Sequence, residues 1–308
     1  MSIKILCDKI IEKQNPTVAG LDPKLDFIPE YILNEAFEKY GKNLEGASAA
    51  IFAFNKGLID ELCDIVPAVK PQSAYYEMYG YHGIKALYDT IQYAKDKGLY
   101  VILDGKRNDI GTTAEAYANA YLGNTDVCGE NFTAFGADSL TVNGYLGTDG
   151  ISPFIEKCDK FEKSIFVLAK TSNPSSGELQ DKKIGEKEIY SQMADMIENW
   201  GNHNINEYGY SNAGAVVGAT YKHQLLQLRK KNKSVFFLVP GYGAQGGGAE
   251  DVVPAFDERG LGAIVNSSRA IMCAYKKGGY DEKDFAKAAK DEALRMKNEI
   301  ISKIGKIG

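Results

Sequence analysis

The chain has 308 residues, of which 44% are apolar and 25% charged, and its formal net charge is -5. This composition is typical of a globular protein that can bury a large core. Lysine and arginine form no stripe with interleaved aromatic residues, so we expect no nucleic-acid surface and favour a small charged metabolite as the ligand.

The first 14 residues carry charges among apolar positions at helical spacing, unlike a secretory signal peptide. No apolar run approaches the roughly 18 residues of a membrane span. The five cysteines are widely spaced without a C-x-x-C pair, and none of the three histidines lies at metal-binding spacing from another. We therefore expect a cytoplasmic protein with no disulfide framework, no metal site and no membrane contact.

Short apolar segments rich in β-branched residues alternate with longer stretches of helical character along the whole chain. Such alternation predicts βαβ units and a parallel sheet, and eight units close naturally into a (β/α)8 TIM barrel. We expect a single α/β domain over residues 1–308, with a doubly wound sheet as the alternative. The predicted strands are 17–22, 67–72, 100–106, 139–143, 164–172, 214–220, 235–242 and 262–269.

The stretch "NPSSGELQDKKIGEKE" (173–188) is the most irregular part of the chain. Its polar composition predicts little packing, and we interpret it as an excursion over one end of the barrel. The sequence does not decide whether it forms part of a lid.

Polar residues stand where the predicted strands end, which is where barrel enzymes place their chemistry. A single polar residue at such a place is ordinary, but their recurrence at most strand ends indicates a functional site. These residues are Asp22, Lys70, Asp104, Lys106, Asn143, Ser172 and Arg269.

The third segment, "YVILDGK" (100–106), concentrates the charge. Because side chains alternate along a strand, Asp104 and Lys106 share the face of Ile102. If that face is the barrel interior, and Lys70 has the same disposition on the neighbouring strand, the mouth holds a row of alternating charges. Asp109 lies beyond the strand and should not reach into its own barrel.

Burying such a row of charges is costly unless each is paired, so stabilisation alone is a poor explanation. Two unit charges about 4 Å apart interact by roughly 4 kcal/mol at an effective dielectric constant of about 20. A lysine beside carboxylates stays protonated and can act as a general acid, and an aspartate near a bound anion destabilises that anion. Loss of the anion as carbon dioxide would relieve this repulsion.

The glycine-rich stretch "GYGAQGGG" (241–248) precedes the strand that ends near Arg269. Glycines allow backbone amides to turn toward an anion, and an arginine supplies a bidentate partner for phosphate. We therefore predict a phosphate site there, although a flexible surface loop would have similar composition.

Several motifs together resemble the orotidine 5'-phosphate decarboxylase family. The pattern D-x-K-x-x-D-I runs from Asp104 to Ile110, after "GLDP" (20–23) and "VKPQ" (69–72). In the second half, "KTSNPSSGELQ" (170–180), "VPGYGAQGG" (239–247) and "IVNSSRAI" (264–271) resemble the family's pyrimidine, lid and phosphate segments. The resemblance spans nearly the whole chain and suggests the longer subgroup of the family.

The resemblance implies decarboxylation of orotidine 5'-phosphate to uridine 5'-phosphate without a cofactor, by a charged network of Lys70, Asp104, Lys106 and Asp109. Lys106 would protonate the ring carbon that loses its carboxylate, and Asp104 would lie against that carboxylate. Lys70 and Asp22 would hold the ribose hydroxyls and order the network.

The resemblance also implies a homodimer in which Asp109 and Thr113 come from the partner subunit. Ser172 would hydrogen-bond the pyrimidine, Gln245 and Arg269 would bind the phosphate, and Pro240 would begin the closing loop. Ser268 stands where many members have glycine, so that a hydroxyl could replace a backbone contact. Ile110, Asn143 and Ser268 complete the expected substrate-binding set.

Three other functions fit parts of the pattern. A sugar-phosphate decarboxylase or synthase on the same barrel would require magnesium, so full activity after chelation would argue against it. A Schiff-base aldolase using Lys70 or Lys170 would be trapped by borohydride. A phosphometabolite-binding protein would show no turnover. An absorbance assay with orotidine 5'-phosphate distinguishes all of them.

Overall fold

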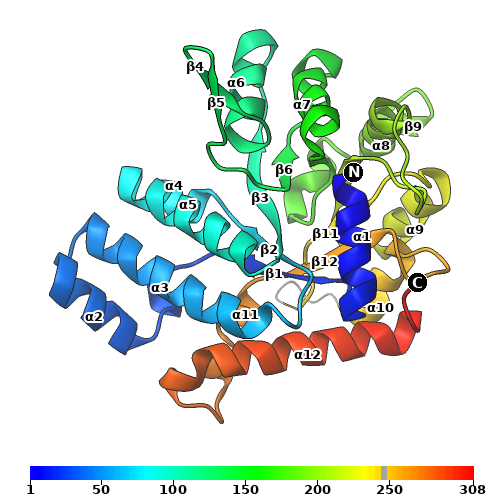
Figure 1. Cartoon of the computed structure of the whole chain (residues 1–308). Coiled ribbons are helices and arrows are strands. Elements are labelled where there is room, and N and C mark those ends of the chain that lie inside the picture. Colours follow the sequence, from blue (N-terminus) through cyan, green and yellow to red (C-terminus); the bar gives the residue numbers. More distant parts are fainter. Residues whose placement is uncertain (244–247) are drawn as a thin grey trace.

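The computed structural model describes residues 1–243 and 248–308. Within these residues, eight strands form a closed barrel in the order β1-β12-β11-β10-β7-β6-β3-β2, and each neighbouring pair is parallel. Helices surround the barrel (Figure 1). The predicted TIM barrel is therefore confirmed, and the doubly wound alternative is wrong.

Each predicted strand overlaps one strand of the barrel, with β3 ending one residue later and β10 beginning one residue earlier than predicted. These are β1 (Thr17–Leu21), β2 (Ala68–Pro71), β3 (Tyr100–Arg107), β6 (Ser139–Val142), β7 (Ser164–Lys170), β10 (Ala213–Val217), β11 (Phe237–Val239) and β12 (Ala263–Ser267). The α-helices are α1 (Ser2–Lys13), α2 (Glu30–Tyr40), α3 (Leu44–Leu62), α4 (Ala74–Glu77), α5 (Gly80–Asp96), α6 (Gly111–Tyr121), α7 (Thr148–Phe161), α8 (Ile189–Gly201), α9 (Lys222–Lys231), α10 (Ala249–Val252), α11 (Arg269–Met272) and α12 (Phe285–Ile304).

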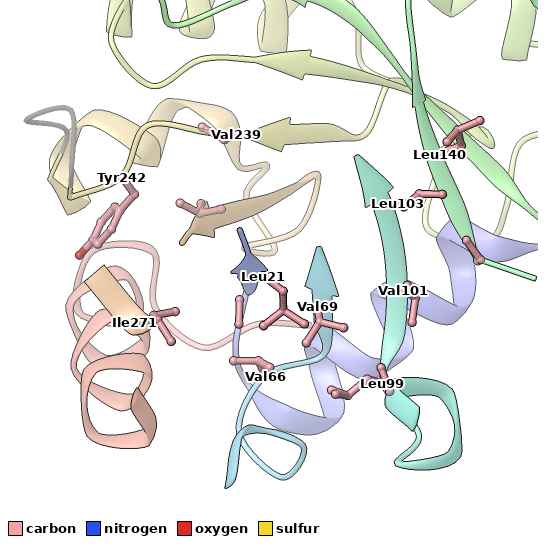
Figure 2. Close-up of a cluster of buried hydrophobic side chains, with 14 of the residues drawn as sticks. Leu21, Val66, Val69, Leu99, Val101, Leu103, Leu140, Val239, Tyr242 and Ile271 are labelled. Carbon is pink, nitrogen blue, oxygen red and sulfur yellow. The ribbon is translucent and has the colours of Figure 1, made fainter. Parts of the chain in front are cut away.

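Alternation along the strands separates an outer from an inner apolar layer. Leu21, Val69, Val101 and Leu103 belong to the outer layer, which packs against the helices (Figure 2). Val18, Ala68 and Ile102 belong to the inner layer. Positions two residues beyond these inner side chains, Lys70 and Asp104, therefore face the mouth of the barrel.

Helix α1 precedes the first strand and belongs to the inner layer. Its residues Ile3, Leu6, Cys7 and Ile10 are fully buried and form one cluster with the interior of the barrel. The hydroxyl of Ser2 lies 2.6 Å from that of Tyr100, which lies 2.7 Å from that of Ser164. The N-terminal ends of the strands are thus covered by α1, at the end of the barrel opposite the charged residues.

Two short antiparallel hairpins were not predicted, namely β4 (Thr125–Val127) with β5 (Glu130–Phe132), and β8 (Lys183–Ile184) with β9 (Lys187–Glu188). Strands of two or three residues give no recognisable period. The second hairpin lies in the 173–188 segment. Within the same segment Ser176 is buried, so this stretch packs more closely than its polar composition predicted.

No helix in residues 1–243 or 248–308 is long and apolar enough to cross a membrane. The cysteines are all free thiols. Cys7 and Cys158 are buried, Cys63 and Cys273 half-buried, and Cys128 exposed.

Candidate active site

Asp104 lies at the centre of a charged network at the C-terminal ends of β2 and β3. Its Oδ2 is 2.7 Å from Nζ of Lys70, and its Oδ1 is 2.6 Å from Nζ of Lys106. The register of the barrel explains the first pair, because β2 lies directly beside β3. The predicted neighbourhood of Lys70, Asp104 and Lys106 is therefore present in the structure.

The three members of the network differ in burial. Asp104 is 8% exposed and Lys70 is 5% exposed, whereas the side chain of Lys106 is 45% exposed. Lys106 is thus the member that can reach a ligand entering the mouth from solvent. The other two are held in place beneath it.

The charges determine the protonation of the buried pair. Burial alone would raise the pKa of Asp104, but the ammonium groups of Lys70 and Lys106 outweigh it and hold that pKa well below its usual range. Burial would lower the pKa of Lys70, yet Asp104 and then Asp22 raise it. Asp104 is therefore a carboxylate and Lys70 an ammonium at neutral pH.

The backbone at Lys106 departs from regular strand geometry. The register between β3 and β6 shifts between Leu103 and Arg107, and Lys106 has a φ of 49°, in the left-handed region that side chains other than glycine rarely adopt. Simple alternation predicted the correct face for Lys106. It did not predict this locally strained backbone, which directs the ammonium back toward Asp104.

Thr141 on β6 holds both the carboxylate and the backbone of the network. Its Oγ1 donates a hydrogen bond of 2.8 Å to Oδ1 of Asp104 and accepts one of 2.9 Å from the amide of Lys106. The residue is 1% exposed. Sequence reasoning missed it, although it lies two positions before Asn143, on the inward face of a predicted strand.

We expect Thr141→Val to lower kcat/KM about tenfold, because the substitution keeps the shape but removes one hydrogen bond to each of two partners. Steady-state kinetics measures this effect. Ser139→Ala is the matched control, since Ser139 points inward from the same strand and its buried hydroxyl has no hydrogen-bond partner in the described residues. Equal losses in both variants would show that Thr141 has no special part in the network.

Asp22 follows β1 and adds a second carboxylate near Lys70. Its Oδ1 is buried and has no hydrogen-bond partner in residues 1–243 and 248–308. An unpaired buried carboxylate oxygen is unfavourable unless a ligand satisfies it. Asp22 can therefore accept a hydrogen bond from a hydroxyl group of a bound molecule.

Asp109 lies outside the network of its own chain. Its Oδ1 accepts a hydrogen bond from the amide of Ile110 at 2.8 Å, and no described ion pair joins it to Lys70 or Lys106. Ile110 is 55% exposed, and Thr113 is exposed in the first turn of α6. Ile110 and Thr113 are thus accessible on the surface of the chain, and Asp109 is half-buried beside them.

Asn143 and Ser172 follow the neighbouring strands β6 and β7. Asn143 is exposed, and its Oδ1 accepts a hydrogen bond from the amide of Tyr145 at 2.9 Å. Ser172 is half-buried and packs so closely against Gly218 that a Cβ there would lie 2.9 Å from that of Ser172. The hydroxyl of Ser172 has no hydrogen-bond partner among the described residues.

The predicted phosphate residues lie around the ends of β11 and β12. Arg269 is exposed at the start of α11 and lines a cavity of about 590 Å³ together with Gly243 and Arg295. Pro240 directly follows β11, and its carbonyl accepts a hydrogen bond from the amide of Ala219. Gln245 lies outside the described residues.

Ser268 is packed against the first strand of the barrel. A Cβ at Gly20 would lie only 1.9 Å from Oγ of Ser268, so this contact requires glycine at position 20. The same Oγ accepts a hydrogen bond of 3.2 Å from Nδ2 of Asn266. The hydroxyl of Ser268 is therefore fixed beside β1, at the edge of the predicted phosphate site.

Neither lysine that could form a Schiff base is a free amine. Lys70 is paired with Asp104, and the fully buried Lys170 is paired with Asp181 at 2.7 Å. A Schiff base requires a neutral amine. Burial would lower the pKa of Lys70, but Asp104 raises it, so Lys70 is not an activated nucleophile for the aldolase alternative.

Comparison with known proteins identifies the family. Residues 54–279, more than half of the chain, match the model of the "Orotidine 5'-phosphate decarboxylase / HUMPS family". The chain belongs to this family. Relatives named orotidine 5'-phosphate decarboxylase include one from Caldicellulosiruptor saccharolyticus, 40% identical over 97% of both chains, and one from Rhodopirellula baltica, 42% identical over 94% of this chain and 96% of the relative.

A solved structure supports the same relationship. The OMP decarboxylase of Leishmania donovani has a TM-score of 0.70 to this chain at 28% identity, and the match covers 96% of this chain and 98% of that one. The length of the chain and its nearly complete coverage of these relatives agree with the longer subgroup of the orotidine 5'-phosphate decarboxylase family.

Proposed function

We propose that Lys70, Asp104 and Lys106 carry out the decarboxylation of orotidine 5'-phosphate to uridine 5'-phosphate, the last step of de novo pyrimidine nucleotide synthesis. The enzyme is a carboxy-lyase. The observation that carries the proposal is the central carboxylate held between two ammonium groups, one buried and one exposed. Relatives that share about two fifths of the residues carry the same name.

The chemistry needs one proton and no cofactor. The bond between the ring carbon and the substrate carboxylate breaks, carbon dioxide leaves, and the electron pair stays on the ring carbon. Lys106 donates its proton to that carbon as a general acid and regains one from solvent afterwards. The half-exposed side chain of Lys106 supports this role, because it is open to a ligand in the mouth of the barrel.

Asp104 and Lys70 prepare this step. Asp104, ionised at neutral pH, lies against the substrate carboxylate, and the repulsion between them is relieved when carbon dioxide departs. Lys70 holds Asp104 in place and, with Asp22, binds the ribose hydroxyls. The unpaired Oδ1 of Asp22 supports this role, because it needs a donor.

We further propose that two chains form an isologous dimer in which Asp109 and Thr113 complete the partner's site. The position of Asp109 after β3, with no ion pair to its own network, supports this arrangement. The exposed Ile110 beside it offers apolar surface to a partner. The pyrimidine ring of the substrate would then contact Ser172, and Asn143 would line the mouth between the subunits.

The phosphate group is proposed to bind between Arg269, Ser268 and the loop from Pro240 through Gln245. This phosphate site lies far from the reacting carbon. The energy of phosphate binding can therefore be used to close the loop and assemble the network around the substrate. The exposed guanidinium of Arg269 beside Gly243 supports the assignment.

Arg269→Ala should raise the Michaelis constant about 10- to 100-fold, because a hydrogen-bonded ion pair with phosphate is lost. Turnover should also fall, since phosphate binding drives closure. Steady-state kinetics gives both numbers. Arg295→Ala is the control, because Arg295 lines the same cavity but is paired with Glu292 and Glu299. An unchanged Michaelis constant in Arg269→Ala would mean that the phosphate binds elsewhere.

The loss of absorbance of orotidine 5'-phosphate, measured before and after exhaustive chelation, tests the activity itself. Turnover that survives chelation is expected from a network of lysines and aspartates. No turnover with this substrate would contradict the proposal, and magnesium-dependent turnover would favour the related sugar-phosphate chemistry.

The five free thiols also lead us to propose that the enzyme works in the cytoplasm.

A further inference from the structure

The end of β7 carries a fully buried lysine that the proposed chemistry does not use. The register between β7 and β10 shifts between Val216 and Val217, where Lys170 pairs with Val217. Such a bulge redirects the side chains that follow it. Lys170 accordingly leaves the inner layer of the barrel and contacts the 173–188 segment, at 0% exposure.

Three neighbouring side chains interact with the ammonium of Lys170. It lies 2.7 Å from Oδ1 of Asp181 and 3.2 Å from Oγ of Ser176, both in the 173–188 segment. It also lies 4.4 Å from the ring centroid of Tyr221, a cation–π distance. A buried ammonium without these partners would be strongly unfavourable, so Lys170 and the segment hold each other in place.

A second pair of contacts fixes the next residue of the chain. The amide of Thr171 donates to Oε1 of Gln180 at 2.9 Å, and Nε2 of Gln180 donates to Oγ1 of Thr171 at 2.7 Å. Asp181, which follows Gln180, accepts a further hydrogen bond of 3.0 Å from Gln224 on α9. The segment is thus tied to Lys170 at the end of β7, to the residue that follows it and to a neighbouring helix.

Ser172 comes directly after these two anchored residues. Its backbone and Cβ lie so close to Gly218 that its position is limited from that side as well. No described hydrogen bond restrains its hydroxyl. The contacts therefore fix the backbone of Ser172 and leave the hydroxyl free to bind a ligand.

We propose that the buried Lys170 and the half-buried Asp181 form a latch that holds the 173–188 segment against β7 and so positions Ser172 for the pyrimidine ring. Lys170 is a positioning residue and does not touch the substrate. The proposal rests on the role given to Ser172 above. The 173–188 segment would then hold the residues of the pyrimidine site in position.

Lys170→Met, Ser172→Ala and the double variant test the latch through the Michaelis constant for orotidine 5'-phosphate. Ser172→Ala should raise it about tenfold, the effect of one hydrogen bond. Lys170→Met should raise it by a similar factor and change kcat less. The double variant should be no worse than either single variant, because both remove the same contact. Lys183→Met, at an exposed lysine of the same segment, should leave the Michaelis constant unchanged.

Asp181→Asn provides a second test if Lys170→Met does not fold. This variant keeps an oxygen that can accept hydrogen bonds from Lys170 and Gln224 but removes the negative charge. We therefore expect a smaller rise of the Michaelis constant than in Lys170→Met. The rise should again be absent when Asp181→Asn is combined with Ser172→Ala. Amide hydrogen exchange should become faster over residues 171–188 in Lys170→Met and Asp181→Asn, and remain unchanged in Lys183→Met.

The possible failures are distinguishable. If Ser172→Ala raises the Michaelis constant but both latch variants leave it unchanged, or if their effects multiply with that of Ser172→Ala, the latch does not act through Ser172. If Ser172→Ala itself has no effect, the proposed role of Ser172 is wrong, and hydrogen exchange decides the latch alone. Unchanged exchange over 171–188 would then overturn it.

Discussion

The Lys106→Ala variant is expected to bind uridine 5'-phosphate yet lose at least about 1000-fold in turnover, within the range contributed by a positioned general acid. The phosphate grip at Arg269 lies apart from the network, so nucleotide affinity should be largely retained. Asp104 should remain paired with Lys70 and Thr141, and the fold should therefore persist. The absorbance assay measures turnover, and calorimetric titration with uridine 5'-phosphate measures binding.

Lys85→Ala is the control for this experiment. Lys85 is an exposed lysine on α5 whose partner is Asp89, one helical turn away. Its removal should change neither turnover nor affinity. Substantial turnover in Lys106→Ala would show that another group protonates the ring carbon, and the mechanism above would have to be abandoned.

Mixing Lys106→Ala and Asp109→Ala proteins should restore activity that neither possesses alone. Each mixed dimer would hold one site with native Lys106 and native Asp109, and one site lacking both. Random exchange makes about half of the dimers mixed, so roughly a quarter of all sites should recover full activity. Turnover of the mixture, compared with wild type at equal concentration, measures this fraction.

Native mass spectrometry of isotope-labelled subunits should accompany this measurement, because it shows whether subunits have exchanged. Demonstrated exchange without recovered turnover would mean that Asp109 does not act across an interface. Activity of the Asp109→Ala protein by itself would mean that the residue is dispensable.

The sequence was sufficient to predict the barrel and the central network. Each predicted segment overlaps one barrel strand, because parallel strands buried on both faces leave unbroken apolar runs. The period of two then placed Lys70, Asp104 and Lys106 on one side of neighbouring strands. The contact between Lys70 and Asp104 follows from the neighbouring positions of β2 and β3 in the barrel.

Other features depend on contacts between distant parts of the chain. In the sequence Thr141 is an ordinary strand residue, and its contact with Lys106 appears only when β6 lies beside β3. The irregular backbone at Lys106 likewise appears only with the register shift between β3 and β6. Lys170 was considered only as a nucleophile, since nothing in the sequence indicates its pairing with Asp181. The role of Asp109 across an interface stays a prediction.

The position of α1 has a consequence for how the protein folds. Ile3 and Leu6 pack with Leu261, Ile264 and Ile307, and β1 pairs with β12. These contacts join residues that are separated by most of the chain, and the loop-closure entropy must be overcome before they can form. The apolar face of α1 is therefore completely covered only when the last strand and the C-terminal residues are in place. Barrel closure should accordingly be a late folding event.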